Sequence, residues 1–355
     1  MNDFRLSFTL KQHTPMIHFQ HDQPGATLRA TELKPKLDRF LLEKEPSLPH
    51  KVHPNDDISL DYRVTIRLQG GSRKDYPMPF VAKGKRGYQA PYFADGVSIE
   101  HNGTVEIVFF TFSTPVRQAI SKWFELFLTF ENFGARQSKG FGGFHLASMS
   151  KSAFERLIAR HPNPVYKLKK HAKGKEALKA IDEFYKHLKS GINYPHRKIY
   201  NKSLLFQYMC NRHLGWEKRR LKQVFPEIVH GSHAPIECSS SPAEYRYIRA
   251  MLGLAEINEY RPDSGKKQIR IESRTLENGQ PAYQRFKSPI TFKVFEDGIY
   301  LFHEHSYREL LDKPFKFRLG RQDTTINTPR SFDLSGFLAF VEKNNQLIEP
   351  IKGGA

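Results

Sequence analysis

The sequence has little cysteine and no long apolar run, and both absences exclude classes of protein. Its two cysteines, Cys210 and Cys238, form no Cys-x-x-Cys pair, so a disulfide framework or structural zinc cluster is not expected. No apolar run reaches the roughly 18 residues of a membrane-spanning helix, and the first residues lack the apolar core of a signal peptide. We therefore expect a cytoplasmic protein that makes no contact with a membrane.

Acidic residues are scarce relative to basic ones. The chain has 56 Lys and Arg residues against 37 Asp and Glu residues, which gives a formal net charge of +19. Residues 160–222 alone hold 17 basic and four acidic residues, so most of the excess lies in this segment. A charge of this size favours a polyanionic partner, and nucleic acid before membrane.

The basic segment is not a low-complexity tail, because it contains apolar residues at helical spacing. These are Leu178, Ile181, Phe184, Tyr185 and Leu188, and then Leu204, Leu205, Tyr208 and Met209. We predict a basic helical region over 160–230 whose outer face contacts phosphates; a solvated helix surface without a ligand is the alternative. Trp216 followed by Lys218, Arg219 and Arg220 favours single-stranded RNA, through base stacking and phosphate contacts.

Apolar patterning organises the first 150 residues. Alternation predicts strands and helical spacing predicts helices in the order 4–10 (strand), 33–41 (helix), 60–68 and 105–112 (strands), 114–131 (helix) and a short strand from Phe144. Thr114 is expected to cap the second helix, and Pro35 is expected in the first turn of the first helix. The order βαββαβ predicts a ferredoxin-like arrangement, an antiparallel sheet with two helices on one face.

Residues 69–96 are rich in Gly, Pro, Lys and Arg and predict a long exposed hairpin or loop whose role stays open. Further on, strand and helix patterns at 247–254, 268–273, 290–302 and 334–343 predict a second, less regular domain. We therefore expect an α+β protein with two domains, residues 1–155 and residues 156–355.

A glycine-rich loop lies between the second helix and the strand at Phe144. It contains Gly134, Gly140, Gly142 and Gly143, with Arg136, Lys139 and Phe141 among them. Glycines permit positive φ and close backbone approach, the two cations attract phosphate, and Phe141 offers a stacking face. The order helix, loop, strand excludes a nucleotide P-loop. A glycine helix cap followed by a strand start is the alternative.

Two segments together resemble the RAMP superfamily of CRISPR-associated proteins. One is Leu28-Arg29-Ala30-Thr31-Glu32-Leu33-Lys34-Pro35-Lys36, which continues through Arg39, and the other is the loop from Gly134 to Gly143. Within that superfamily the chain is similar to the two-domain subunit at the guide 3′ end of type III-B (Cmr) effector complexes. It departs from the family pattern at Pro35, where glycine is usual.

The resemblance implies two ferredoxin-like (RRM-like) RAMP domains, with the basic helical region as an insertion. It also implies a subunit that binds guide RNA and target RNA, assembles with other RAMP subunits in antiviral defence, and has no catalytic site. We expect no metal and no cofactor. From the resemblance and the basic pattern, we expect the following residues to contact RNA: Arg29, Lys34, Lys36, Arg39, Gly134, Arg136, Lys139, Gly140, Phe141, Gly142, Gly143, Lys218, Arg219 and Arg220.

Two other functions stay open at this point. A metal-independent endoribonuclease of the same superfamily, which processes repeat RNA, would use His13, His18 or His21 as general acid or base; the alternative reading places these histidines on an exposed or RNA-facing loop. A general RNA-binding module unrelated to CRISPR is the other. His303-Glu304-His305 lacks the His-Glu-x-x-His spacing, and a metal site there is not expected.

Overall fold

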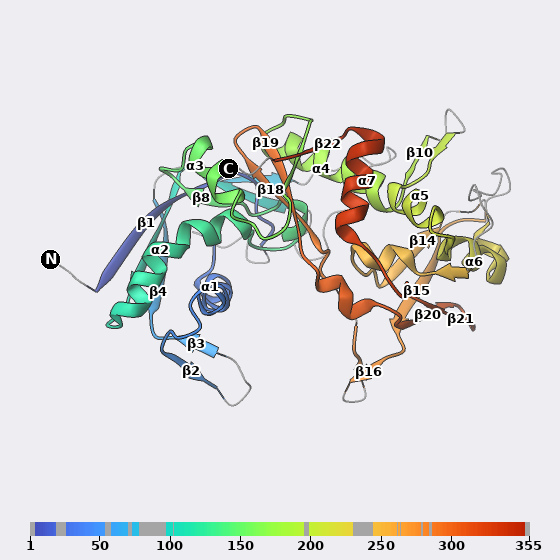
Figure 1. Cartoon of the computed structure of the whole chain (residues 1–355), viewed down its shortest axis with the longest axis horizontal. Helices are drawn as coiled ribbons and strands as arrows, with labels where there is room; N and C mark the ends of the chain where they lie inside the picture. The colour runs from blue at the N-terminus through green and yellow to red at the C-terminus, as the bar shows by residue number, and fades with distance from the viewer. Residues whose placement is uncertain are drawn as a thin grey trace. The chain divides into compact units, whose positions relative to one another are not determined.

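The chain folds as two compact units, each described here by itself. The computed structural model describes residues 4–18, 26–53, 58–69, 73–77, 97–101, 103–194, 199–229, 244–260, 262, 264–277, 280–283 and 286–351. Unit 1 comprises residues 1–181, 291–302 and 350–355, and unit 2 comprises residues 182–290 and 303–349. Helices and strands are mixed throughout, which confirms the α+β class (Figure 1).

The first sheet of unit 1 is antiparallel and has the strand order β4-β7-β1-β8. Its strands are β1 (Arg5–Gln12), β4 (Arg63–Gln69), β7 (Thr104–Phe110) and β8 (Phe144–Leu146). Helices α1 (Ala30–Lys44) and α2 (Thr114–Phe130) bury their apolar sides against one face of this sheet, in a core that includes Leu37, Ile107 and Phe124. The chain order is therefore β1-α1-β4-β7-α2-β8, as the apolar patterning predicted.

Two local predictions in this region were wrong. The N-cap of α2 is Ser113, whose hydroxyl accepts from the N–H of Val116, so the helix is capped one residue before Thr114. Helix α1 begins at Ala30, which places Pro35 in its second turn. The proline is tolerated there because Thr31, whose carbonyl loses its helical partner, is exposed and open to water.

Short hairpins flank this sheet. Strands β2 (His50–Val52) and β3 (Ile58–Leu60) pair with each other, as do β5 (Arg73–Pro77) and β6 (Val97–His101). The long hairpin or loop predicted over residues 69–96 stays a prediction for the most part, because residues 70–72 and 78–96 lie outside the described residues; β5 pairs with β6, which follows this segment.

The second sheet has the order β18-β19-β9-β22. Its strands are β9 (Tyr166–Leu168), β18 (Ile290–Phe295), β19 (Gly298–His303) and β22 (Ile348–Pro350), and α3 (Lys151–Ile158) and α4 (Gly174–Lys189) are the helices nearest to β9 in the chain. Every residue of β18 and β19 is buried. The ring of Phe154 on α3 stacks on Phe295 with centroids 4.4 Å apart.

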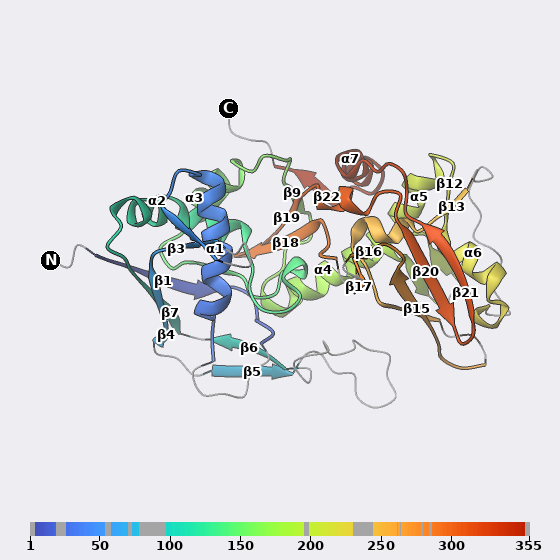
Figure 2. The same cartoon turned by 90° about the horizontal axis from the view of Figure 1, so that it is seen from below.

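Unit 2 contains an antiparallel sheet in the order β14-β15-β20-β21. Its strands are β14 (Ile257–Tyr260), β15 (Lys267–Ser273), β20 (Pro314–Leu319) and β21 (Gln322–Asn327); β20 and β21 form a hairpin beside β15 (Figure 2). The smaller strand pairs are β10 (Ile192–Tyr194) with β11 (Ile199–Asn201), β12 (Leu214–Trp216) with β13 (Glu244–Arg246), and β16 (Leu276–Glu277) with β17 (Gln280–Pro281).

The helices of unit 2 are α5 (Leu204–Cys210), α6 (Glu217–Val224) and α7 (Leu334–Asn345). Helix α7 starts after Asp333, whose carboxylate caps it, as predicted. The predicted helix at 247–254 is instead a 3₁₀ turn over Ile248–Leu252. Cys210, at the end of α5, is disulfide-bonded, and Cys238 lies outside the described residues.

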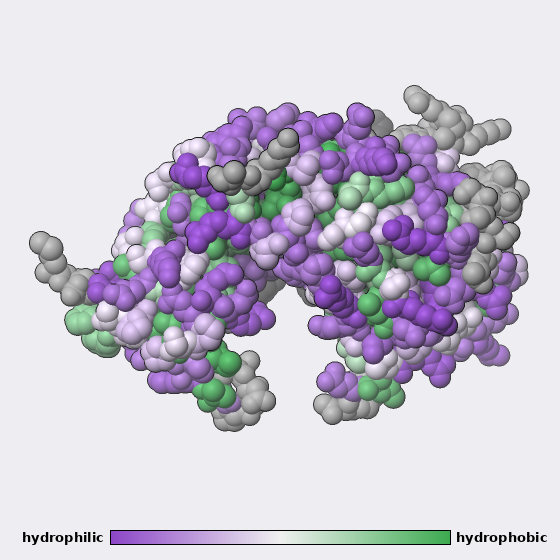
Figure 3. Space-filling model, in the orientation of Figure 1, coloured by the Kyte–Doolittle hydropathy of each residue, from purple (hydrophilic) through white to green (hydrophobic). Residues whose placement is uncertain are grey.

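Hydrophilic residues cover most of the face drawn in Figure 3, with apolar patches among them. In the described part of the chain, no helix is long and apolar enough to cross a membrane.

Candidate nucleic-acid interface

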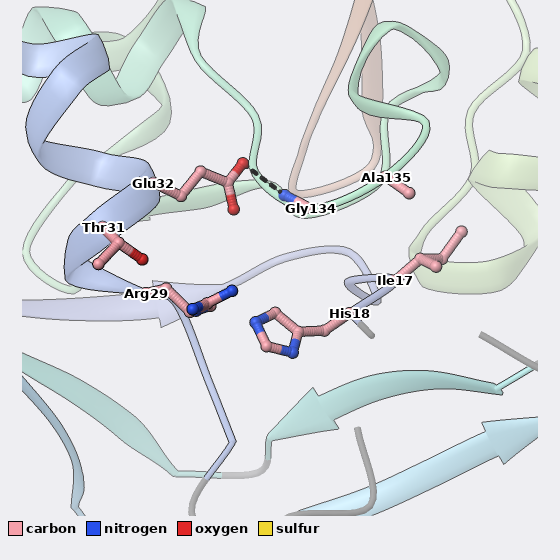
Figure 4. A pocket seen from close by; sticks show the side chains of 7 residues that line it. All are labelled: Ile17, His18, Arg29, Thr31, Glu32, Gly134 and Ala135. Carbon is pink, nitrogen blue, oxygen red and sulfur yellow. Dashed lines mark hydrogen bonds between the residues drawn. The ribbon is translucent and has the colours of Figure 1, made fainter. Parts of the chain in front are cut away.

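A pocket of about 450 Å³ lies in unit 1 where the start of α1 meets the glycine-rich loop. It is lined by Ile17, His18, Arg29, Thr31, Glu32, Gly134 and Ala135. The side chains of Arg29 and His18 lie close together on one side of it, and Glu32 reaches across to the backbone of Gly134 (Figure 4). The pocket thus joins the two sequence segments that carry the family resemblance.

This pocket holds groups of both signs, because the carboxylate of Glu32 lines it beside two features that attract an anion. Helix α1 has no side-chain cap at its N-terminus, so the N–H groups of its first turn carry the positive end of the helix dipole. The N-cap residue is Arg29, which adds a guanidinium at the same place. A phosphate group matches this combination of backbone donors and cation.

The glycines of the loop approach the protein's own backbone. At Gly134, with φ +80°, a Cβ would lie 2.5 Å from the carbonyl oxygen of Ile17. At Gly142, with φ +70°, it would lie 1.8 Å from the carbonyl oxygen of Phe133. Gly140 and Gly143 are also buried, but a Cβ there would meet side chains, Ile181 at 2.8 Å and Thr14 at 3.0 Å. These glycines therefore set the loop's path; contact of their backbone with RNA stays a prediction.

Backbone hydrogen bonds clamp the loop to the segment after β1. The N–H of Ala135 donates to Ile17 O, and the N–H of Gly142 donates to Pro15 O, each at 2.9 Å. The buried hydroxyl of Thr14 donates to Gly140 O at 2.7 Å and accepts from the N–H of Gly143 at 2.9 Å. These bonds consequently hold the glycine-rich loop at its start, at Ala135, and at its end, from Gly140 to Gly143.

Two side chains of α1, one turn apart, hold the loop from the other side. The carboxylate of Glu32 accepts from the N–H of Gly134 at 2.8 Å and from the side-chain amide of Gln137 at 2.9 Å. The ammonium of Lys36 donates to Asn132 O at 2.7 Å and to Gln137 Oε1 at 2.6 Å. It also pairs with Glu131, whose carboxylate lies 3.1 Å away. Lys36 therefore orders the loop, and any contact with RNA would compete with these bonds.

The other predicted basic residues of α1 and the loop differ in their surroundings. The ammonium of Lys34 bonds to Asp38 and Leu60 O, and it lies 3.8 Å from the centre of the Tyr62 ring. Arg39 is exposed on α1, and its Nε donates to Pro35 O. Arg136 is exposed in the left-handed conformation, with φ 58°. Of this set, Arg29, Arg39 and Arg136 present guanidinium groups at the surface or the pocket.

Phe141 was expected to offer a stacking face, and the structure corrects this. Its side chain is 6 % exposed and packs with Ile17, so the ring belongs to the core beneath the loop. Lys139, which precedes it, is half-buried. The pattern of aromatic and basic residues did not reveal this burial, because glycines on both sides let the chain turn inward at Phe141.

The second predicted group lies on α6 in unit 2. Trp216 is 4 % exposed and its indole N–H donates to Glu217, so it is not the free stacking platform that the sequence suggested. Glu217 is fully buried and also binds the N–H of Ile248 and the guanidinium of Arg249. The ammonium of Lys218 lies 5.2 Å from the centre of the Trp216 ring, and burial together with the nearby Arg249 lowers the pKa of Lys218 to about 8.

The next two residues of α6 face outward to different degrees. Arg219 is half-buried, and Arg220 is exposed. Arg220 lines a second pocket, of about 310 Å³, together with Tyr245, Arg246 and residues of β21. Arg246 already pairs with Glu244 and Asp312. The structure thus separates the predicted contacts into a group in unit 1 and a group in unit 2.

Of the three histidines considered for catalysis, the structure describes His13 and His18, and neither is exposed. The ring of His13 packs edge-on against that of His145, with centroids 4.5 Å apart, and in a tilted arrangement against that of Phe295 at 5.0 Å. Burial, with Lys293 and Lys11 nearby, lowers the pKa of His13 to about 4, so it is neutral at pH 7. His18 is 4 % exposed and lines the pocket; His21 lies outside the described residues.

Other polar residues around the loop were not singled out from the sequence. Lys293 on β18 is fully buried, and its ammonium donates to Leu128 O at 2.7 Å and to Glu131 O at 2.5 Å, at the end of α2. Asn132 donates to Gln137 O and to Phe292 O, each at 2.8 Å. One hint of the role of Lys293 was available in the sequence, because this lysine interrupts the apolar pattern of its strand. Among the described residues, no cluster of His, Cys, Asp or Glu side chains is arranged to hold a metal ion.

Comparison with known families decides the identity of the chain. Residues 3–192 match the sequence model of the Cmr1 N-terminal domain, and residues 200–352 match that of the Cmr1 C-terminal domain. The chain belongs to the Cmr1 family. It is a RAMP-type subunit of the CRISPR type III Cmr complex, and such a complex has further subunits.

A solved structure resembles this Cmr1-family chain along its whole length. The crystal structure of Cmr1 from Pyrococcus furiosus in the apo form aligns with a TM-score of 0.42 and 9% sequence identity, covering 99% of this chain and 100% of that one. No curated protein sequence matches the chain.

Proposed function

We propose that the chain is a non-catalytic RNA-binding subunit that contacts the 3′ part of the guide RNA, the guide–target duplex, or both, in the cytoplasm. The observation that carries this proposal is the pocket in which the uncapped start of α1, Arg29 and the glycine-rich loop meet. A phosphate seated there would receive backbone N–H donors and a guanidinium together. The basic segment at 160–222 would add salt-sensitive contacts to the RNA backbone.

We also propose that the chain contains two ferredoxin-like domains, divided near residues 155 and 156. The first is supported by the chain order β1-α1-β4-β7-α2-β8 with the spatial order β4-β7-β1-β8. The second domain is supported by the same chain order of strands and helices, β9-α4-β18-β19-α7-β22. Its strands also take the same places in their sheet, in the order β18-β19-β9-β22. In this reading most of the basic helical region is an insertion between α4 and β18.

The absence of catalysis is supported by the surroundings of His13. A general acid or base must reach the 2′-hydroxyl or the leaving oxygen of the RNA. The ring of His13 is instead packed among His145 and Phe295, and its lowered pKa leaves it without the proton that a general acid would donate at pH 7. Incubation of the pure protein with repeat RNA in EDTA is expected to leave the RNA intact. Specific cutting that is lost in His13→Ala would contradict this.

Affinity purification of the tagged chain from cells that carry the complex tests the proposal. We expect guide RNAs and other RAMP subunits to co-purify, and RNase digestion of the isolated complex to leave the guide 3′ segment protected by this subunit. Isolation of the chain alone, with equal affinity for DNA and RNA, would contradict the proposal and favour a general nucleic-acid-binding module.

A further inference from the structure

The first sheet has one face that the helices do not bury. Along β1 and β4, buried or half-buried residues alternate with exposed ones. The core residues of the sheet, such as Leu10 and Ile107, face α1 and α2. Because side chains alternate between the two faces of a strand, Arg5, Ser7, Thr9, Lys11, Arg63, Thr65, Arg67 and Gln69 stand on the opposite face and are exposed.

The strand register places an aromatic ring between two arginines on this open face. Phe110 on the central strand β7 is opposite Arg5 on β1 and opposite Arg63 on β4. Directly opposed residues on one face lie about 4.5–5.5 Å apart at Cβ, so the three side chains form one continuous row. Two further rows cross all three strands, with Val108 and Glu106 at their centres, and a shorter row pairs Thr104 with Gln69.

Two more phenylalanines extend this ring into an exposed aromatic cluster. Phe112 is 72 % exposed and Phe4 is 46 % exposed. The ring of Phe112 meets that of Phe110 edge-on at 5.0 Å and that of Phe4 edge-on at 5.1 Å. Large apolar rings that gather at the surface in this way, instead of in the core, mark a contact surface. We call Phe4, Phe110, Phe112, Arg5 and Arg63 the aromatic face.

The charge of the open sheet face selects the kind of partner. Strands β1, β4 and β7 place four basic residues on this face: Arg5, Lys11, Arg63 and Arg67. The one acidic residue that these strands place there is Glu106. Within the described residues, none of these four basic side chains forms a salt bridge or a side-chain hydrogen bond. Aromatic rings on which bases can stack, beside guanidinium groups that donate to phosphate oxygens, match single-stranded nucleic acid. The second sheet offers no such face, because β18 and β19 are buried throughout.

We propose that the aromatic face is a second RNA-contact surface of this chain, separate from the pocket at α1. Bases of a single-stranded RNA segment stack on Phe112, Phe110 and Phe4, and Arg5 and Arg63 bind the flanking phosphates. The proposal rests on the proposed function only in taking RNA as the ligand, since none of these residues lines the pocket.

Binding of labelled RNA to the full chain tests the aromatic face. The probes are a 12-nucleotide oligouridylate and a 12-base-pair RNA duplex, and the variants are Phe112→Ala and Phe112→Trp. Val52→Ala is the matched control, because Val52 is an exposed apolar residue of the same unit, at 64 %. Alanine removal of one stacking ring is expected to weaken oligouridylate binding by about fivefold or more, with duplex binding changed by less than about twofold. In Phe112→Trp, RNA is expected to bind normally and to quench the new indole fluorescence.

Several results would overturn this inference. Unchanged oligouridylate affinity in Phe112→Ala, or indole fluorescence in Phe112→Trp that RNA does not alter, would do so. Loss of a co-purifying subunit with RNA affinity intact would show a protein-docking face instead. If Arg29→Ala weakens RNA binding and Phe112→Ala does not, this inference alone fails; if the wild-type chain binds no RNA, the proposed function fails with it.

Discussion

The carboxylate of Glu32, at the start of α1, accepts a hydrogen bond of 2.8 Å from the backbone N–H of Gly134. These residues are 102 positions apart in the chain, and they join the two segments of the family resemblance. The bond fixes the start of the glycine-rich loop beside Arg29 and so shapes the pocket.

Removal of this carboxylate is expected to destabilise unit 1. In Glu32→Ala, the N–H of Gly134 and the side-chain amide of Gln137 lose their acceptor. Leaving partly buried donors without a partner costs about 1–3 kcal/mol of unfolding free energy, which urea denaturation measures. The control is Glu43→Ala, since the Glu43 side chain is 72% exposed and pairs with the neighbouring Lys44. Equal losses in the two variants would contradict a role for Glu32 in holding the loop.

Gly142→Ala tests the packing of the loop. A Cβ at this position would lie 1.8 Å from Phe133 O, a distance that requires the backbone to move. We expect a loss of about 4 kcal/mol or more, or failure to fold. Gly320→Ala is matched in its positive φ, but nothing lies within 4 Å of its added Cβ, so a loss of only about 1–2 kcal/mol is expected. Thermal unfolding of both variants measures the two losses of stability. Similar losses would show that Gly142 is required for its positive φ and not for close packing.

Buried Lys293 predicts a pH dependence of stability. Burial lowers its pKa from 10.5 to about 7, with Lys36 nearby acting in the same direction. The unfolded chain therefore binds more protons between pH 7 and 10.5, and the contribution of Lys293 to stability rises with pH across that window. Unfolding free energy measured from pH 7 to pH 9.5 is expected to rise more steeply in the wild type than in Lys293→Met. Parallel curves would contradict the lowered pKa; the exposed Lys343→Met is the control.

Much of the fold follows from local patterns. The apolar stripe from Val116 to Phe127 and the Asp333 cap predicted α2 and α7 within a few residues. The apolar sequence patterns were less informative for the strands of the second sheet, whose arrangement depends on tertiary packing. Strands β9 and β22 have three residues each, too few to show a period, and neither was predicted. Strands β18 and β19 were predicted from their apolar residues, but both of their faces are buried, so no alternation showed how they pack.

The site was predicted in outline and differs in detail. The two segments do meet, but the sequence did not distinguish residues that hold the loop from residues at the pocket surface. Glu32 and Lys36 lie one turn apart on one side of α1, and their partners come from a loop about 100 positions away. Phe141 and Trp216 were expected to stack on bases because aromatic residues beside cations often do, whereas both fill the core.

RNA affinity of the Arg29→Ala variant tests the central claim most directly. The control is Arg321→Ala, which removes an equal charge at an exposed position on the turn between β20 and β21. If the pocket binds a phosphate, Arg29→Ala should weaken guide RNA binding by about tenfold or more, equivalent to a charge-assisted bond of about 1.5–3 kcal/mol, and should lower the salt slope by about one unit. Arg321→Ala should change affinity by less than about twofold. Equal affinity of Arg29→Ala and Arg321→Ala for guide RNA would contradict the account.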